Sequence, residues 1–280
     1  MADVGMADDG RGVFSEDLLK RHISRWAVLL AASVLSLAAP TLSAQSAAQD
    51  SLRAAIERAV IETDWGSLER VTTQLRAAVA TDAGRTNAWL HYDLAYTLHR
   101  RANGLLVEEK AEQAKTMLEE AVQFAARARA LGGNAQAQAL QGAVTGQLAG
   151  ASGGFAMMRL GRASFRLLDE AVAAAPRDAR VALLNGMSRM NAPAFAGGGA
   201  VRGEAELRRA VTLYASDRSA SPQPTWGRAD AHIWLGIALE KQGKWSEAQA
   251  EFTRALALAP GHRWILETLQ PALARRGATR

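Results

Sequence analysis

The chain has 280 residues, of which 49% are hydrophobic and 22% are charged, an ordinary composition for a folded protein. Alanine dominates the hydrophobic residues, and aromatic residues make up only 6%. Because alanine has the highest helix propensity and strands favour branched or aromatic residues, this composition predicts an all-α protein. The absence of cysteine excludes thiol catalysis, thiolate metal sites and a lipid-modified N-terminal cysteine.

The formal net charge of +5 is mildly basic. A basic surface attracts nucleic acid, anionic lipid or acidic polymers. It is equally compatible with an ordinary solvated surface that has no charged partner. Export of the chain, predicted from the next segments, makes nucleic acid the least expected partner.

Residues 1–19 form an N-terminal extension that carries five acidic residues. Acidic residues at this place oppose the charge bias of an export signal. Either the extension is tolerated, or translation starts later than Met1.

Residues 20–44 are predicted to be a signal peptide. A basic region, 20–25, precedes 14 residues without a charge, 26–39, and Ala44 ends a small-residue cleavage site before Gln45. We therefore expect a periplasmic protein with its mature N-terminus near Gln45. The alternative is an uncleaved membrane anchor, for which the run is short because a spanning helix takes about 20 apolar residues.

Residues 48–275 are predicted to form one domain of repeated helix pairs. A leucine followed three residues later by an alanine recurs along it. These pairs are Leu75 and Ala78, Leu118 and Ala121, Leu168 and Ala171, and Leu207 and Ala210. Stacked units of this kind bury their cores only against their neighbours, which favours one domain over two.

The middle units are longer than the last one. In the last unit a small residue, Gly236, precedes Ala255 by 19 residues, whereas the corresponding intervals in the second to fourth units are 24 to 29 residues. We expect the extra residues in longer helices or in longer connections. The first unit, 48–81, has only Trp65 and its apolar spacing in its favour.

Two segments interrupt the helical pattern. Residues 193–199 contain Pro193, Phe195 and three consecutive glycines, and they predict a flexible or tightly turned insertion. Residues 215–228 (ASDRSASPQPTWGR) are rich in serine and proline and predict a loop between the fourth and fifth units.

The helix that contains Arg159, Arg162 and Arg166 carries these residues on one side, opposite its leucines. Phe155 and Met158 come just before them. The pattern is typical of a solvated outer helix, and contact with a membrane surface or a protein is the less favoured alternative.

The most regular pattern spans residues 229–260. Leu235-Gly236, Leu239, Ala248, Phe252, Ala255 and Pro260 fall at positions 7, 8, 11, 20, 24, 27 and 32 of a unit. Gly243 is predicted to end the first helix of this unit, and Pro260 the second. The tail 262–276 then predicts a capping helix with Ile265, Leu269 and Leu273 facing inward.

This pattern resembles the tetratricopeptide repeat family. The resemblance implies an all-α, right-handed α-solenoid of about five helix pairs, each with an A and a B helix, plus a C-terminal capping helix. A narrower resemblance, carried by Pro193, Phe195 and Gly197 to Gly199, is to exported bacterial repeat proteins with a Pro-x-x-Phe-Gly-Gly-Gly-like insertion and no assigned activity. Here Ala196 intervenes, so the spacing departs from that motif.

The family binds partners in a concave groove lined by positions 2, 5, 9 and 12 of each A helix. The resemblance transfers this role to Asn87, Leu90, Leu94, Thr97, Arg180, Leu183, Met187, Met190, Asp230, Ile233, Ile237 and Glu240. These positions are mostly apolar, which suits a hydrophobic peptide or helix. We expect Leu183, Met187 and Met190 to be partly exposed, although core packing is the alternative.

No local catalytic motif, phosphate-binding loop or metal-ligand spacing occurs in the sequence, so we expect no enzyme, no cofactor and no metal. The favoured function is a periplasmic scaffold that binds an envelope protein or peptide in the groove. The alternative is an accessory component of an envelope transport system that binds a solute-binding protein or a small ligand.

Overall fold

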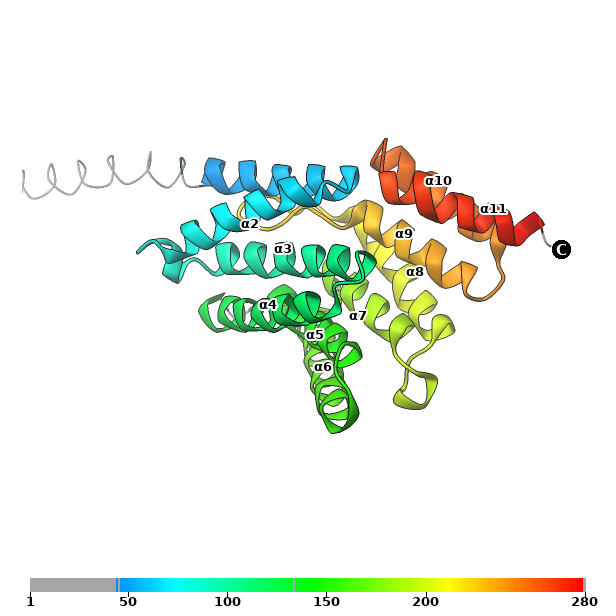
Figure 1. Cartoon of the computed structure of the whole chain (residues 1–280), viewed down its shortest axis with the longest axis horizontal. Helices are drawn as coiled ribbons and strands as arrows, with labels where there is room; N and C mark the ends of the chain where they lie inside the picture. Colours follow the sequence, from blue (N-terminus) through cyan, green and yellow to red (C-terminus); the bar gives the residue numbers. More distant parts are fainter. Residues whose placement is uncertain (1–43, 45, 133, 279–280) are drawn as a thin grey trace, which may run out of the picture. The chain divides into compact units, whose positions relative to one another are not determined.

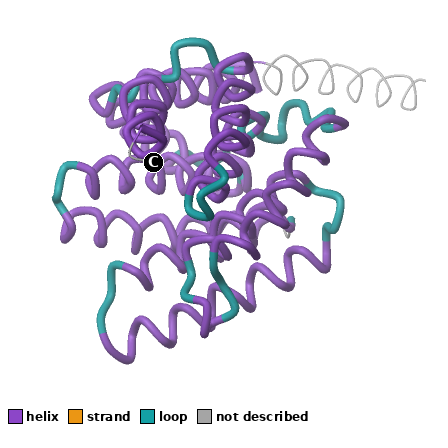
Figure 2. The backbone as a smooth tube through the Cα atoms, turned by 90° about the vertical axis from the view of Figure 1, so that its right-hand side faces the viewer, coloured by secondary structure: helices purple, strands orange, loops and turns teal. Residues whose placement is uncertain are grey.

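The computed structural model describes residues 44, 46–132 and 134–278. The chain divides into two compact units, 1–48 and 49–280, and the second contains nearly all the described residues. The predicted extension 1–19 and signal peptide 20–44 lie outside the described residues, apart from Ala44. Within the described residues all regular secondary structure is helical (Figures 1 and 2).

The compact part 49–280 consists of five helix pairs and a cap, as predicted. The pairs are residues 49–62 with α2 (Trp65–Ala80), α3 (Ala88–Val107) with α4 (Ala111–Gly132), α5 (Ala135–Gly150) with α6 (Gly154–Ala174), α7 (Ala179–Asn191) with α8 (Ala200–Ser216), and α9 (Arg228–Glu240) with α10 (Trp245–Leu258). The cap is a π-turn, η3 (Ile265–Leu269), followed by α11 (Gln270–Ala278). Two short 3-10 turns, η1 (Gly84–Thr86) and η2 (Ala194–Ala196), lie in connections.

Polar residues begin several of these helices. Asp64, Asn87, Asn134 and Asp178 each stand directly before a helix and accept hydrogen bonds from backbone N–H groups of its first turn. These N–H groups have no carbonyl partner within the helix, so the caps stabilise the helix starts. Gly243, with φ of 75°, follows α9 as predicted.

Small residues allow the two helices of a pair to pack at a short distance from each other. A Cβ added to Gly236 would lie 2.5 Å from the ring of Phe252, and a Cβ on Gly142 or Gly186 would lie 2.8 Å from a leucine of the partner helix. These distances are too short for real Cβ contacts. The predicted register of the third, fourth and fifth units is therefore confirmed.

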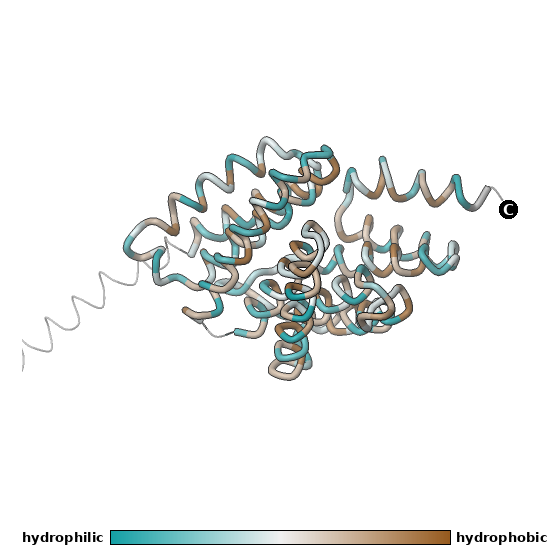
Figure 3. Tube along the Cα trace, turned by 60° about the horizontal axis from the view of Figure 1, so that its bottom comes forward, coloured by the Kyte–Doolittle hydropathy of each residue, from teal (hydrophilic) through white to brown (hydrophobic). Residues whose placement is uncertain are grey.

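The extra length of the middle units has two sources. Helices α3, α4 and α6 have 20, 22 and 21 residues, whereas α9 and α10 have 13 and 14. In the fourth unit the additional residues lie in the connection 192–199 instead. Hydrophobic and hydrophilic residues interchange along these helices (Figure 3), because one side of each faces the stack.

The cap packs as predicted. Ile265, Leu269 and Leu273 are all buried. The π-turn stands directly before Pro271, which has no N–H to donate, and the helix then continues to Ala278. The cap thus closes the hydrophobic core behind the fifth unit.

Helix pairs that are far apart in the chain contact each other. Arg263 donates a hydrogen bond from Nη1 to the carbonyl of Glu62 at 3.4 Å, and Arg100 on α3 pairs with Asp230 on α9 at 2.9 Å. Figure 1 shows the first helix pair and α10 along the same side of the domain. The ends of the repeat stack are therefore joined by direct contacts.

Candidate interaction site

Most of the predicted groove residues are buried. Leu94, Leu183 and Ile233 are 1% exposed or less, and Met190 is 4% exposed. The expectation of partial exposure is therefore wrong for Leu183 and Met190. Met187 is half-buried, as are Asn87, Leu90 and Ile237. The role of these positions in binding a partner remains a prediction.

The polar members of the predicted groove have partners within the chain. The Asn87 side chain caps α3, and the Thr97 hydroxyl donates to the carbonyl of Asp93 at 2.6 Å. Asp230 pairs with Arg100, and Glu240 pairs with Arg276 of the cap at 2.7 Å. These side chains hold the domain together, so the face of the A helices does not present them as free polar groups.

Residues 217–227, which we call the crossing segment, cover this face. The segment connects α8 to α9 and contains no helix or strand. Its residues Pro224, Trp226 and Gly227 are buried, whereas residues 221–223 are exposed. The predicted loop is confirmed, but its sequence gave no sign that it would pack against the A helices.

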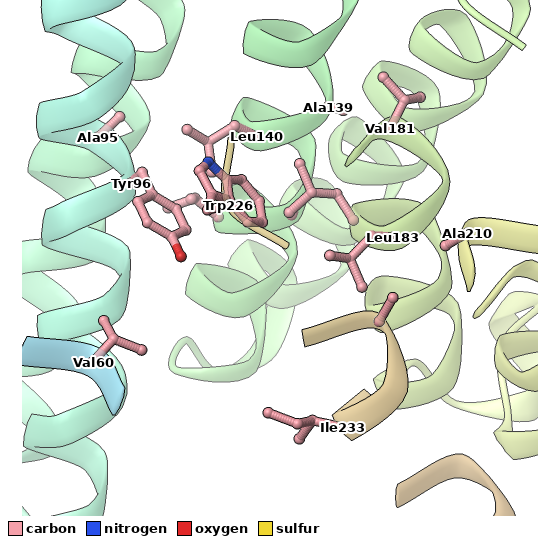
Figure 4. Close-up of a cluster of buried hydrophobic side chains, with 14 of the residues drawn as sticks. Val60, Ala95, Tyr96, Ala139, Leu140, Val181, Leu183, Ala210, Trp226 and Ile233 are labelled. Atoms are coloured by element: carbon pink, nitrogen blue, oxygen red, sulfur yellow. The ribbon is translucent and has the colours of Figure 1, made fainter. Parts of the chain in front are cut away.

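Trp226 anchors the crossing segment among four A helices. Its ring stacks on that of Tyr96 with 4.3 Å between the centroids and 15° between the planes. Figure 4 shows Trp226 next to Tyr96 of α3 and Leu140 of α5, with Leu183 of α7 and Ile233 of α9 farther away. The indole is 7% exposed. The segment therefore fills this space with its own aromatic side chain.

Gly227 allows the segment to turn into α9. Its φ is 109°, in the region that favours glycine, and a Cβ there would lie 2.0 Å from the Tyr214 hydroxyl. That hydroxyl donates a hydrogen bond to the carbonyl of Trp226 at 3.2 Å. Close backbone packing thus adds to the aromatic anchor.

Arg180 on α7 holds the start of the crossing segment. Its side chain is 1% exposed, and its Nη1 lies 3.2 Å from Asp217 and 3.1 Å from the Ser219 hydroxyl. The guanidinium lies over the ring of Tyr214 at 5.6 Å. A buried charge needs an opposite charge nearby, so Arg180 and Asp217 stabilise each other. This predicted groove residue binds the chain's own segment.

Arg53, on the first helix, holds the far part of the segment. Its Nε donates to both oxygens of Asp93 at 2.9 and 3.0 Å, and its Nη1 donates to the carbonyl of Gln223 at 3.3 Å. Its Nη2 is buried without a hydrogen-bond partner among the described residues. Burial raises the pKa of the Asp93 carboxyl, and the charge of Arg53 opposes this effect.

Glu57 lies beside this network with a weaker set of partners. The Tyr96 hydroxyl donates to its Oε1 at 3.4 Å. Burial, and then the negative charge of Asp230, raise the pKa of Glu57 to about 7, while Arg100 opposes the increase. This carboxyl therefore changes its charge near neutral pH.

A half-open pocket of about 350 Å³ lies between the first helix, α3 and the crossing segment. Arg53, Glu57 and Asp93 line one side of it, and Tyr96 and Trp226 contribute aromatic rings. A volume of this size lies at the lower end of the range for small-molecule sites. The pocket exists only because the crossing segment packs over the A helices. The sequence of the first helix and that of the loop therefore did not predict it.

The glycine-rich insertion is a compact turn. The N–H groups of Gly198 and Gly199 donate to the carbonyls of Pro193 and Arg189 at 3.0 and 2.9 Å. A Cβ on Gly198 would lie 2.3 Å from the carbonyl oxygen of Ala192. Phe195 in this turn is 92% exposed. The predicted tight turn is thus confirmed, with its aromatic residue on the surface.

The described part of the chain contains no group of three or more side chains placed to hold a metal ion. Nor does any helix among the described residues have the length and hydrophobicity needed to cross a bilayer.

Comparison with known proteins agrees with this architecture. Residues 229–262 match the family model described as tetratricopeptide repeat. The chain is similar in structure to the HusA haemophore from Porphyromonas gingivalis, with 22% identity, a TM-score of 0.53, and coverage of 69% of this chain and 92% of that chain. Two structures of kinesin light chain TPR-like repeats from Podosopora anserina are 18% and 17% identical over 75% of this chain and 91% and 92% of theirs, with TM-scores of 0.31 and 0.30. No curated protein sequence matches.

The fold and the matched repeat define a scaffold of stacked helix pairs, a class that typically mediates interactions between proteins and is not catalytic. Residues 229–262 of the chain form a tetratricopeptide repeat. At 22% identity the likeness to the haemophore shows a shared fold.

Proposed function

We propose that the protein is a non-catalytic scaffold that binds an extended polypeptide on the face of its A helices. The observation that carries this proposal is the crossing segment, a polypeptide without regular secondary structure that already lies there. It is held at one end by Arg180, at the other by Arg53, and by an aromatic slot at Trp226. A partner with an acidic residue and an aromatic residue at similar spacing would find the same contacts.

In this proposal the crossing segment occupies the site until a partner displaces it. Residues 221–223 at the exposed part of the segment are accessible for the first contact. The half-buried groove positions, such as Met187 and Ile237, then become part of the contact surface. Displacement costs free energy, so the partner must bind the open face more tightly than the segment does.

A synthetic peptide with the sequence of residues 215–228 tests this function. In the parent protein the face is occupied, so the labelled peptide should not bind. A variant in which residues 218–226 are replaced by a glycine-serine linker of equal length should bind it, as measured by fluorescence anisotropy. The same peptide with Trp226→Ala should bind at least about tenfold more weakly, because an aromatic anchor often contributes 2 kcal/mol or more.

Circular dichroism must first establish that the linker variant is folded. A folded linker variant that binds neither peptide would rule out a polypeptide site on this face. If the linker variant is unfolded, the single substitution Trp226→Ser can be used instead, because it removes only the aromatic anchor of the crossing segment.

A second candidate function is the binding of a small ligand in the pocket beside Arg53 and Glu57. The unpartnered Nη2 of Arg53 and the titratable carboxyl of Glu57 supply one donor and one acceptor in a volume of about 350 Å³. This would fit an accessory role in transport. Native mass spectrometry of the purified protein would reveal a retained small molecule, and a mass equal to that of the chain alone would count against it.

We also propose that the chain is exported to the periplasm and meets an envelope protein there. The basis is the pattern of residues 20–44, with its basic start, apolar run and small-residue end. N-terminal sequencing of the protein from a periplasmic extract should begin near Gln45. Recovery of an intact N-terminus from the cytoplasm would disprove export.

A further inference from the structure

Helix α6 carries an exposed stripe that the repeat stack does not use. Phe155, Arg159, Arg162 and Arg166 are exposed and follow one another at intervals of three or four residues, so they share one side of the helix. Met158 lies beside them and is 50% exposed. The opposite side of α6, including Leu167 and Leu168, is buried against α5 and the core.

The three arginines of this stripe have no carboxylate partner among the described residues. Many other arginines of the domain do, such as Arg76 with Glu120, and Arg208 with both Glu204 and Glu247. Arginines without a carboxylate partner keep their attraction for an external anion. The stripe is therefore a local positive surface as far as Arg166, beyond which the exposed Asp169 pairs with Arg189.

Apolar side chains stand at the N-terminal end of the stripe. Phe155 is 76% exposed, Phe195 in the connection between α7 and α8 is 92% exposed, and Val201 in the first turn of α8 is 69% exposed. Because α5 packs on α7, the connections that follow these two helices lie at the same edge of the domain. Figure 1 shows both at the lower edge, and Figure 3 brings that edge forward.

We propose that this edge binds the surface of an anionic lipid bilayer. Phe155, Met158 and Phe195 would enter the boundary between headgroups and acyl chains, and the arginines of α6 would pair with lipid phosphates. Phe155 and Met158 stand at the start of α6 and Phe195 in the connection after α7, and basic side chains follow along α6, an arrangement that suits contact with a flat anionic layer.

This surface is separate from the face covered by the crossing segment. The proposed polypeptide site uses the A helices, whereas the lipid surface uses the outer side of the B helix α6 and the connection between α7 and α8. Membrane attachment would thus leave the polypeptide site free.

A fluorescent label at position 158 tests the proposal directly. The chain has no cysteine, so Met158→Cys gives a single attachment point for an environment-sensitive dye. With vesicles of phosphatidylcholine and phosphatidylglycerol, the emission should shift to the blue, and with phosphatidylcholine alone it should not. The dye reports only its own surroundings, so a membrane contact made by residues 26–39 would not produce the shift. A label at Gln249→Cys, on the exposed side of α10, should not respond.

Substitution of the arginines tests the charge. Arg159→Gln, Arg162→Gln and Arg166→Gln together should weaken vesicle binding on the order of 100-fold, because each basic residue near an anionic surface adds about a fivefold gain. A charge-matched control with Arg58→Gln, Arg177→Gln and Arg218→Gln should bind nearly as the parent does. Phe155→Ser with Phe195→Ser should abolish the dye shift without changing the melting temperature, since both side chains are exposed.

Three results would overturn the proposal. The first is an unchanged emission at position 158 in anionic vesicles, which would leave an acidic protein as the partner. The second is an equal loss of binding in the charge-matched control, which would mean that only net charge matters. The third is a dimer in analytical ultracentrifugation that Phe195→Ser dissociates, which would assign the edge to a second copy of the chain.

Discussion

Glycine residues in this domain differ in what surrounds them. Gly236 on α9 faces the ring of Phe252, which is fully buried and cannot move without disturbing the core. Gly161 on α6 has nothing within 4 Å of the place where a Cβ would stand. The same substitution at the two positions therefore has opposite consequences.

Gly236→Ala should destabilise the domain by about 1–3 kcal/mol, because the added methyl overlaps an aromatic ring. Gly161→Ala should instead stabilise it by about 0.5–1 kcal/mol, because alanine reduces the entropy lost by the chain in a helix. Urea unfolding followed by circular dichroism measures both. An equal effect of the two substitutions would mean that the α9–α10 contact is not as close as described.

Glu57 is the residue through which pH should act on stability. Its pKa of about 7 in the folded protein is above the ordinary value of 4.5, so the folded state holds the proton more tightly than the unfolded state. Stability is therefore full below about pH 4.5 for this group and falls as the pH rises toward 7.

Glu57→Gln removes this dependence. We expect the variant to be more stable than the parent at pH 8 by about 1–3 kcal/mol and nearly equal to it at pH 5. The comparison of the two proteins isolates Glu57, because all other titrating groups are shared. A constant difference between them from pH 5 to pH 8 would contradict the raised pKa.

At the scale of elements, the crossing segment behaves as a part of the core although it has no helix or strand. Trp226 is as buried as many helical residues, and Asp217 provides the countercharge of Arg180. A segment of this kind is stable only while its anchors hold, because it has no internal backbone ladder. Its attachment should therefore be sensitive to a single change at an anchor.

Asp217→Asn should cost about 3–5 kcal/mol, because it leaves the buried Arg180 without an opposite charge. Arg218→Gln, at the neighbouring exposed position, should change stability by less than about 0.5 kcal/mol. Limited proteolysis should also cut residues 217–227 faster in Asp217→Asn than in the parent. Equal proteolysis of both variants would show that the ion pair does not hold the segment.

Across the whole molecule, contacts between distant units distinguish this domain from an open stack of repeats. Arg100 and Asp230 are 130 residues apart in the chain, and both side chains are more than four-fifths buried. In an open stack each unit contacts only its neighbours, so the first and last units unfold independently. Here the second and fifth helix pairs support each other through this ion pair.

A double-mutant cycle measures the coupling free energy between Arg100 and Asp230. Arg100→Gln and Asp230→Asn should each destabilise the domain, and together they should cost less than the sum of the two, with a coupling of about 1–3 kcal/mol. The pair Arg263→Gln and Glu267→Gln, which is exposed and lies within one turn, should show a coupling below about 0.5 kcal/mol. A coupling near zero for the first pair would mean that the units are independent.

The repeat architecture was predictable because residues close together in the sequence of each helix pair indicate how its two helices pack. Gly236, Phe252 and Ala255 are small or large according to their place between two helices, and a large residue followed three residues later by alanine recurs in every B helix. Helix caps such as Asp178 and the inward face of the capping helix follow from the same short-range rules. Within the described residues, helix order and pairing thus depended on residues only a few turns apart.

Whether the predicted groove residues are exposed or buried depended on contacts between residues far apart in the chain. Leu183 and Met190 were expected at an exposed surface, yet they are buried, because Leu183 lies against Gly227 of the crossing segment and Met190 against Gly203 of α8. Serine and proline in that segment indicated a loop, and a loop is normally on the surface. Only the three-dimensional arrangement brings Trp226 to Tyr96, 130 residues earlier, since no local pattern records a contact across the stack.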